Sequence, residues 1–477
     1  MISRVFINIT AAFLLCLGMS SVGSMAVTTT EYVKTAVDPK ALEKALENLD
    51  LPFDLKPSAL NFDHLNLLEV PVVGASSIWF VETPDLSIVT FSLLLRHSGS
   101  AFEPKDKRGL QLLLVRMLDE GAGEYRRDAF KKLLIEHHIK LTVVPDNDTL
   151  MLGFSVPKAS VEKAFQALKL ILSSLRFDEE EIKKVKGQLL VQLHQLLENE
   201  EQKAEETLKK HLMRDHPYVV TIKEQIDNIP HISSKDLSDF TKKNWTKDRI
   251  IMAAVGNITQ NQLQAYVKDM PSPLPEKGEE VRLSPVTFFD LGKRTHVTLD
   301  VPQTIVRFAQ KGITRQHPDY FAHELALEIL GSGDLGCRLM KRIREEKGLV
   351  YGIGASLLIQ EYGQLITGMT STRTQTVEDV ITLIKDEWEN LIERGVSEKE
   401  LSHAKKRMNG LFLMRLDNTI GLTRTLIGMQ YHHLGKDYLT KRAQKINAVT
   451  LDQMNDVIKK HFSLEDLTFV TVGRGND

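Results

Sequence analysis

Along the first half of the chain, the apolar residues show two kinds of pattern, one typical of strands and the other typical of helices. Residues 87–95 (S-I-V-T-F-S-L-L-L) and 149–156 (T-L-M-L-G-F-S-V) are rich in apolar, β-branched and aromatic residues, which predicts strands. Residues 108–120 and 160–175 have the apolar spacing of amphipathic helices. A further strand pattern at 250–256 (I-I-M-A-A-V-G) ends this half. These elements predict a unit of mixed α and β structure.

The second half of the chain repeats this order of elements. Its predicted strands lie at 297–301, 306–310, 365–371 and 467–473, and its predicted helices at 320–330 and 377–393. The last strand of each half ends in a Val-Gly pair, at 255–256 and again at 472–473. An order of elements that recurs along one chain indicates a tandem duplication.

Two local motifs support the duplication. Asp178-x-x-Glu181 and Ser397-x-x-Glu400 both have the spacing of a capping box at the start of a helix. The offset between these two motifs is nearly the same as the offset between the two Val-Gly pairs. Between the halves, the Pro-rich stretch at 271–278 predicts a linker. We therefore expect an α+β fold of two homologous tandem domains, each a mainly antiparallel sheet packed with helices.

The first 26 residues have the pattern of a secretory signal peptide. Arg4 precedes an apolar stretch at 11–17, and Ser24-Met25-Ala26 is a small-x-small cleavage site. An uncleaved anchor stays open as an alternative. We expect export to the periplasm or to the medium, without stable membrane insertion after cleavage. The expected segments are a signal peptide at 1–26, an N-terminal extension at 27–65, a first domain at 66–270, a linker at 271–290 and a second domain at 291–477.

The composition gives no support for binding to nucleic acid or to an anionic membrane. The chain has 61 Lys and Arg against 63 Asp and Glu, a net charge of −2, so nothing in its bulk charge favours nucleic acid or an anionic membrane. Removal of the signal peptide leaves Cys337 as the single cysteine, so we expect no internal disulfide.

Residues 108–121 (R-G-L-Q-L-L-L-V-R-M-L-D-E-G) resemble the zinc-binding helix of the pitrilysin/insulinase family of zinc peptidases, G-L-x-H-x-L-E-H-x-x-x-x-G. The resemblance covers roughly residues 70–477 and is strongest for the two-domain processing peptidases of that family. Four positions keep the frame of the motif: Gly109, Leu110, Leu114 and Gly121.

The catalytic positions of this motif are all changed. The resemblance implies two zinc-binding histidines and a general-base glutamate where this chain has Leu112, Arg116 and, between them, Val115. It implies a third ligand, a glutamate on a later helix, where this chain has Gln192. Aliphatic side chains have no lone pair for a metal, and a guanidinium repels one. We therefore expect no metal or other cofactor in this chain and no hydrolysis by the chain alone.

Other close pairs of histidines do not suggest a second metal site. Adjacent residues point to different faces of a helix, and residues five apart do not converge well. We therefore interpret these histidines as ordinary surface or core residues: His137 with His138, His211 with His216, and His432 with His433.

A second motif of the same family is retained. Residues 337–352 (C-R-L-M-K-R-I-R-E-E-K-G-L-V-Y-G) resemble its S-R-L-x-x-x-L-R-E-x-x-G-L-x-Y-x pattern. The resemblance implies that Arg344 and Tyr351 contact the peptide near the scissile bond and the oxyanion that forms there. Both side chains are hydrogen-bond donors that need no metal. The alternative is that Arg344 is a surface charge and Tyr351 a residue packed on the sheet.

A chain that lacks the zinc ligands and retains the substrate contacts resembles the non-metal subunit of a two-chain peptidase of this family. The resemblance implies a clamshell around an extended peptide, with Arg344 and Tyr351 acting in trans on the zinc site of a homologous partner subunit. Three alternatives stay open: a scaffold subunit without a role in proteolysis, a peptide-binding protein of the cell envelope, and a peptidase with an unconventional site. A homodimer also stays open.

Overall fold

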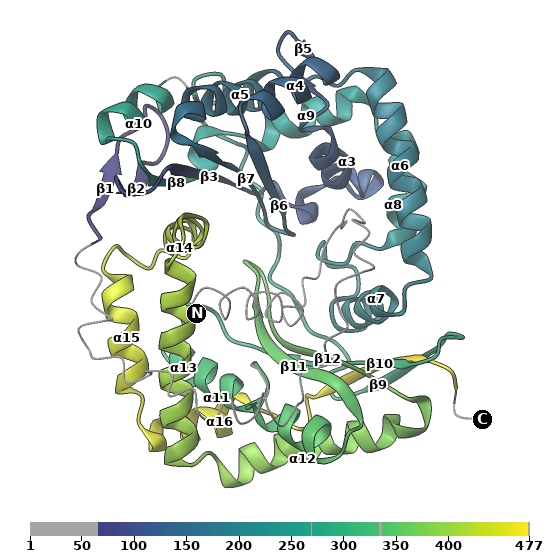
Figure 1. Ribbon diagram of the computed structural model, residues 1–477. Coiled ribbons are helices and arrows are strands. Elements are labelled where there is room, and N and C mark those ends of the chain that lie inside the picture. Colours follow the sequence, from purple (N-terminus) through teal and green to yellow (C-terminus); the bar gives the residue numbers. More distant parts are fainter. Residues whose placement is uncertain (1–64, 269, 333–335, 476–477) are drawn as a thin grey trace, which may run out of the picture. The chain divides into compact units, whose positions relative to one another are not determined.

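The computed structural model describes residues 65–268, 270–332 and 336–475 (Figure 1). The predicted signal peptide at 1–26 and all but the last residue of the predicted extension at 27–65 lie outside these ranges. Among the helices in the described ranges, none is both long enough and apolar enough to span a bilayer.

The first half forms a six-stranded sheet in the order β1-β2-β8-β3-β7-β6, antiparallel throughout except for the β2–β8 pair. Its strands are β1 (Leu67–Val70), β2 (Ile78–Glu82), β3 (Ile88–Arg96), β6 (Lys140–Pro145), β7 (Thr149–Pro157) and β8 (Ile250–Gly256), with a separate hairpin of β4 (Gly121–Ala122) and β5 (Tyr125–Arg126). Its helices are α3 (Leu110–Met117), α4 (Arg127–Glu136), α5 (Val161–Ser174), α6 (Glu179–Leu197), α7 (Glu200–Met213), α8 (Ile222–Asn228), α9 (Ser234–Asn244) and α10 (Gln260–Val267).

The second half forms a five-stranded sheet in the order β11-β12-β10-β13-β9, antiparallel except for the β13–β9 pair. Its strands are β9 (Arg294–Thr298), β10 (Thr304–Lys311), β11 (Val350–Ile359), β12 (Gln364–Thr372) and β13 (Thr468–Gly473). Its helices are α11 (Tyr320–Leu330), the π-helix η7 (Met340–Glu346), α12 (Val377–Arg394), α13 (Glu398–Leu416), α14 (Thr419–Tyr431), α15 (Tyr438–Ala448) and α16 (Leu451–His461).

The two sheets have the same topology. Strands β2-β8-β3-β7-β6 of the first sheet correspond one by one to β9-β13-β10-β12-β11 of the second, and the single parallel pair occupies the same place in both. Helices α6 and α13 each have 19 residues and hold equivalent places in the order of elements. The α+β fold of two homologous domains predicted from the sequence is confirmed.

Both faces of strand β8 are buried, and this explains its uninterrupted apolar sequence. Alternate side chains of a strand point to opposite faces of the sheet. One set, Ile250, Met252 and Ala254, lies in the core of the first half. The other set, Ile251, Ala253 and Val255, packs against helix α14 of the second half, where it contacts a cluster that contains Leu426.

In the reciprocal contact, a helix of the first half packs against the second sheet. Helix α7 packs on β10 and β13 (Figure 1). Its Leu208 and Leu212 share a cluster with Val470 and Val472, while Phe469 of the same strand points into the core of the second half. Helix α7 directly follows α6, just as α14 directly follows α13. Equivalent helices of the two halves therefore cover each other's sheets.

One of the two predicted capping boxes is present, and the other prediction is wrong. The Ser397 hydroxyl accepts the backbone N–H of Glu400, and the Glu400 carboxylate accepts the N–H of Ser397. Asp178 does stand at the N-cap of α6, but its side chain caps no backbone N–H. Both of its carboxylate oxygens instead accept hydrogen bonds from the guanidinium of Arg176, at 2.9 and 3.0 Å. The carboxylate of Asp178 therefore binds the charged side chain of Arg176 and not the backbone N–H groups at the start of the helix.

Candidate functional site

Helix α3 carries the three altered positions of the zinc motif. Leu112 and Val115 are half-buried and pack against the core of the first half. Arg116 is also half-buried, one turn of helix after Leu112. The acids that follow it pair with other cations: Lys131 binds Asp119 (3.4 Å) and Glu120 (2.5 Å), and Arg127 also binds Glu120 (2.6 Å).

A buried glutamate fixes the start of this helix. Gly109, with φ of +96°, stands at the N-cap, and a Cβ there would lie 2.8 Å from Ile229. Because glycine has no side chain to cap the helix, the carboxylate of Glu103 does so, accepting the N–H groups of Gly109 (3.0 Å) and Gln111 (2.6 Å). Burial raises the pKa of Glu103 to about 7, against the opposing effect of these two N–H groups and of Arg108.

The structure brings Gln192 next to Arg116. Gln192 is exposed on α6, and its side-chain oxygen accepts a hydrogen bond from Nη2 of Arg116 at 3.3 Å. The four altered positions therefore supply two aliphatic side chains, a guanidinium and an amide that accepts from it. This set does not fit zinc, because it offers neither an imidazole nor a carboxylate and places a fixed positive charge at the site.

Arg344 and Tyr351 lie together in the second half. Arg344 is on η7, and its Cζ is 5.5 Å from the centre of the Tyr351 ring. Tyr351 is 88% exposed although it belongs to strand β11. The register of β11 against β12 shifts between Val350 and Ile353, and such a bulge turns a side chain away from the regular sheet. The π-helix and the bulge are both local irregularities of the kind found at functional sites.

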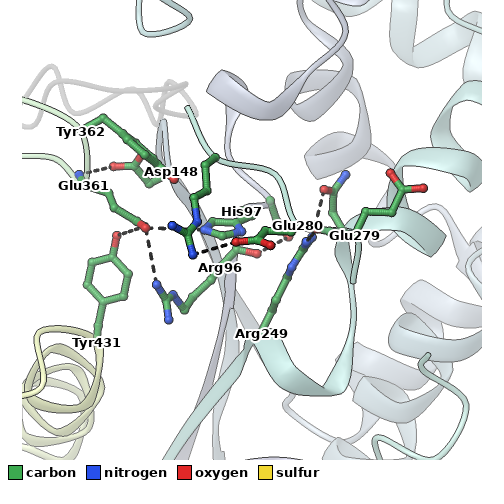
Figure 2. Close-up of polar contacts among 12 residues, drawn as sticks. Arg96, His97, Asp148, Arg249, Glu279, Glu280, Glu361, Tyr362 and Tyr431 are labelled. Atoms are coloured by element: carbon green, nitrogen blue, oxygen red, sulfur yellow. Dashed lines mark hydrogen bonds and ion pairs between the residues drawn. The ribbon is translucent and has the colours of Figure 1, made fainter. Parts of the chain in front are cut away.

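A polar cluster that was not predicted from the sequence joins the two halves (Figure 2). Asp148, in the turn between β6 and β7, accepts the hydroxyl of Tyr218 (2.6 Å) and the backbone N–H of Glu361 (2.8 Å). The Tyr218 hydroxyl in turn accepts the N–H of Tyr362 (3.0 Å). Burial raises the pKa of Asp148 to about 6, although these hydrogen bonds oppose the shift.

The carboxylate of Glu361 extends this cluster. It lies 3.5 Å from Arg96, 3.6 Å from His97 and 3.4 Å from the hydroxyl of Tyr431 (Figure 2). Burial alone raises the pKa of Glu361, but His97, Arg96 and Tyr431 together lower it. No local motif marks this cluster, because Asp148 and Glu361 are 213 residues apart in the sequence. Its contacts position the β11–β12 hairpin, and β11 carries Tyr351.

Comparison with known proteins identifies the family. Residues 82–224 match the model of insulinase (peptidase family M16), and residues 231–408 match the model of the peptidase M16 inactive domain. The non-peptidase homolog YmxG of Helicobacter pylori is 26% identical over 419 residues, which span 88% of this chain and 95% of that protein. The mitochondrial-processing peptidase subunit beta of Dictyostelium discoideum is 22% identical over 353 residues, 71% of this chain and 74% of that protein.

A solved structure has the same fold. The crystal structure of a peptidase M16 inactive domain from Pseudomonas fluorescens superimposes with a TM-score of 0.81 at 23% identity, over 86% of this chain and 98% of that one. This similarity establishes the fold. The two family models show that the chain belongs to the insulinase family of M16 peptidases, as a member in which the zinc-binding positions of the first domain hold neither histidine nor carboxylate.

Proposed function

We propose that this chain is the non-catalytic subunit of a two-subunit M16 peptidase. In this proposal a homologous partner subunit holds the zinc ion, and the chain described here presents Arg344 and Tyr351 to the peptide bound there. The two side chains bind the peptide carbonyl and stabilise the negative charge that forms on its oxygen as water attacks.

The observation that carries the proposal is the contrast between the altered motif and the retained one. In the retained motif, Cζ of Arg344 lies 5.5 Å from the centre of the Tyr351 ring, and the tyrosine is 88% exposed. A tyrosine kept only for packing would bury its ring, because the ring is its main contribution to a core. In the altered motif, by contrast, Arg116 and Gln192 bind each other.

An extended peptide is the substrate that best fits this surface. Strand β11 is at the edge of its sheet, so the backbone groups along its outer side are not used by a neighbouring strand of that sheet. Peptides bind such edges as an added strand, with affinity from backbone hydrogen bonds and little dependence on side chains. Tyr351 belongs to this strand, so a bound peptide would pass beside the Arg344 and Tyr351 pair.

Export of the chain is part of the proposal, and it rests on residues 1–26 alone. The partner is therefore to be sought in envelope extracts. A native pull-down of the tagged mature chain, followed by mass spectrometry, is expected to recover a protein of similar size with an intact His-x-x-Glu-His helix. Recovery of the chain alone, or with unrelated membrane assemblies, would favour the scaffold or peptide-binding alternatives.

The reconstituted pair then allows a direct test of Arg344. We expect Arg344→Ala to reduce peptide turnover on the order of a hundredfold, as the loss of one oxyanion donor typically does. Assembly of the pair and its zinc content should not change. Arg342→Ala is the matched control, because Arg342 is on the same π-helix and pairs only at the surface with Glu346 (2.9 Å). Undiminished turnover in Arg344→Ala would exclude a catalytic contribution from Arg344.

A further inference from the structure

Two histidines and an aspartate that are distant in sequence meet in the second half. His317 and Asp319 precede helix α11, and His461 ends helix α16, which packs against α11. Oδ2 of Asp319 is 2.8 Å from Nε2 of His461 and 3.7 Å from Nδ1 of His317. One ligand atom from each residue lies within 4.8 Å of the other two. No sequence motif links these residues, because only the packing of the two helices brings His461 to the other two.

A third histidine beside this group has an unusual environment. His323 follows Asp319 by one helical turn, and its side chain is 0% exposed. Within the part of the chain that the structure describes, neither of its ring nitrogens has a hydrogen-bond partner. Its ring centre is 6.0 Å from that of His461. A buried imidazole without a partner is costly, which sets this group apart from an ordinary surface ion-pair network.

Imidazole and carboxylate are the ligand types that zinc takes in open sites with three protein ligands. Ligands about 2 Å from a tetrahedral zinc ion lie roughly 3.3 Å from each other. The separations of 2.8 and 3.7 Å around Asp319 bracket this value, and the ligand atoms of His317 and His461 lie within 4.8 Å of each other. Nδ1 of His317 accepts the backbone N–H of Asp319 at 3.1 Å, so coordination through this atom requires that the imidazole turn away from that hydrogen bond. Magnesium and calcium, which prefer oxygen ligands, fit such a set poorly.

We propose that His317, Asp319 and His461 bind a divalent transition-metal cation such as zinc, at a site separate from the altered motif on α3 and α6. The cation would link the start of α11 to the end of α16 and thereby stabilise the second domain. This proposal does not depend on the proposed function, because none of its residues belongs to the Arg344 and Tyr351 pair.

Lys460 would compete with a cation for Asp319. Its ammonium nitrogen is 2.8 Å from Oδ2 of Asp319, the oxygen that His461 also contacts. The Lys460 side chain is 62% exposed, so it can turn into solvent when a cation binds. Removal of this lysine therefore distinguishes a metal site from a plain ion-pair network. If the group is a metal site, removal of Lys460 should raise its affinity for the cation. If it is only a network of ion pairs, removal of Lys460 should not create or strengthen cation binding.

The test is zinc binding to the metal-free, untagged mature chain, measured by calorimetry and by metal analysis after dialysis. We expect one equivalent of Zn²⁺ and a rise in the midpoint of thermal unfolding when Zn²⁺ is added. Asp319→Asn and His461→Ala should weaken binding at least about tenfold. Lys460→Met should strengthen it by up to about fivefold, which corresponds to the loss of one exposed ion pair.

His403→Ala is the matched control, since His403 is exposed on α13 and should not alter binding. Binding of less than half an equivalent by the parent chain would overturn the proposal, as would equal affinities of the parent, Asp319→Asn and Lys460→Met. Should His461→Ala fail to fold, Lys460→Met still decides, because only a metal site predicts tighter binding in that variant.

Discussion

Glu103 caps the altered helix α3, and its protonation should make the free energy of unfolding depend on pH. Its pKa of about 7 in the folded chain exceeds the usual 4.5, so the folded state binds more protons than the unfolded state between these values. The free energy of unfolding should therefore fall as the pH rises from about 4.5 to 7, with this one group contributing on the order of 3 kcal/mol. Glu103→Gln should flatten this part of the pH profile, as measured by denaturant unfolding at several pH values.

Glu124→Gln is the control for this experiment, because Glu124 is exposed between β4 and β5. An unchanged slope in Glu103→Gln would mean that the carboxylate is ionised throughout this pH range in the folded chain. Its two backbone donors would then outweigh its burial.

Single residues differ in how far the sequence reveals their surroundings. Gln192 could be placed beside Arg116 by counting along the chain, because both are on helices whose spacing the family motif preserves. The grouping of His317 with His461 could not, since only the packing of α11 on α16 brings them together. The same holds for Asp148 and Glu361, which meet through turns that carry no motif.

The N-termini of α6 and α13 provide a comparison at the scale of elements, because equivalent helices begin in different ways. Ser397→Ala should lower the free energy of unfolding by about 1 kcal/mol, since it removes a side chain that accepts a backbone N–H. Asp178→Ala should cost no more than about 0.5 kcal/mol, because it removes only a partly exposed ion pair with Arg176. Denaturant unfolding of both variants against the parent measures the difference. Equal losses would show that Asp178 does cap its helix in solution.

Elements with a clearly apolar sequence are among those that the sequence predicts most accurately. The predicted helix at 320–330 and the predicted strand at 250–256 coincide with α11 and β8. The helix predicted at 108–120 is shorter in the structure, where α3 spans Leu110–Met117. It begins at Leu110 because Gly109 adopts a left-handed conformation. The exchange of α7 and α14 between the sheets lies beyond such a prediction, since an apolar helix face does not reveal which sheet it covers.

At the scale of the whole molecule, this exchange makes the two domains depend on each other. Helix α14 belongs to the second half but buries Leu426 against strands of the first sheet, and α7 makes the reciprocal contact. Neither sheet can bury both of its faces with helices from its own half alone. These reciprocal contacts should couple the unfolding of the two domains, although the sequence consists of two repeats.

Leu426→Ala tests this dependence. Leu426 is 0% exposed, so its truncation should cost about 2 to 5 kcal/mol. Because the domains are coupled, hydrogen exchange should accelerate in β3 and β8 of the first half as well as in β10 and β13 of the second. Ile420→Ala, an exposed position on the same helix, should change stability by less than about 0.5 kcal/mol. Faster exchange confined to either half would mean that the two domains unfold separately. If it were confined to the second half, α14 would also add little to the first sheet.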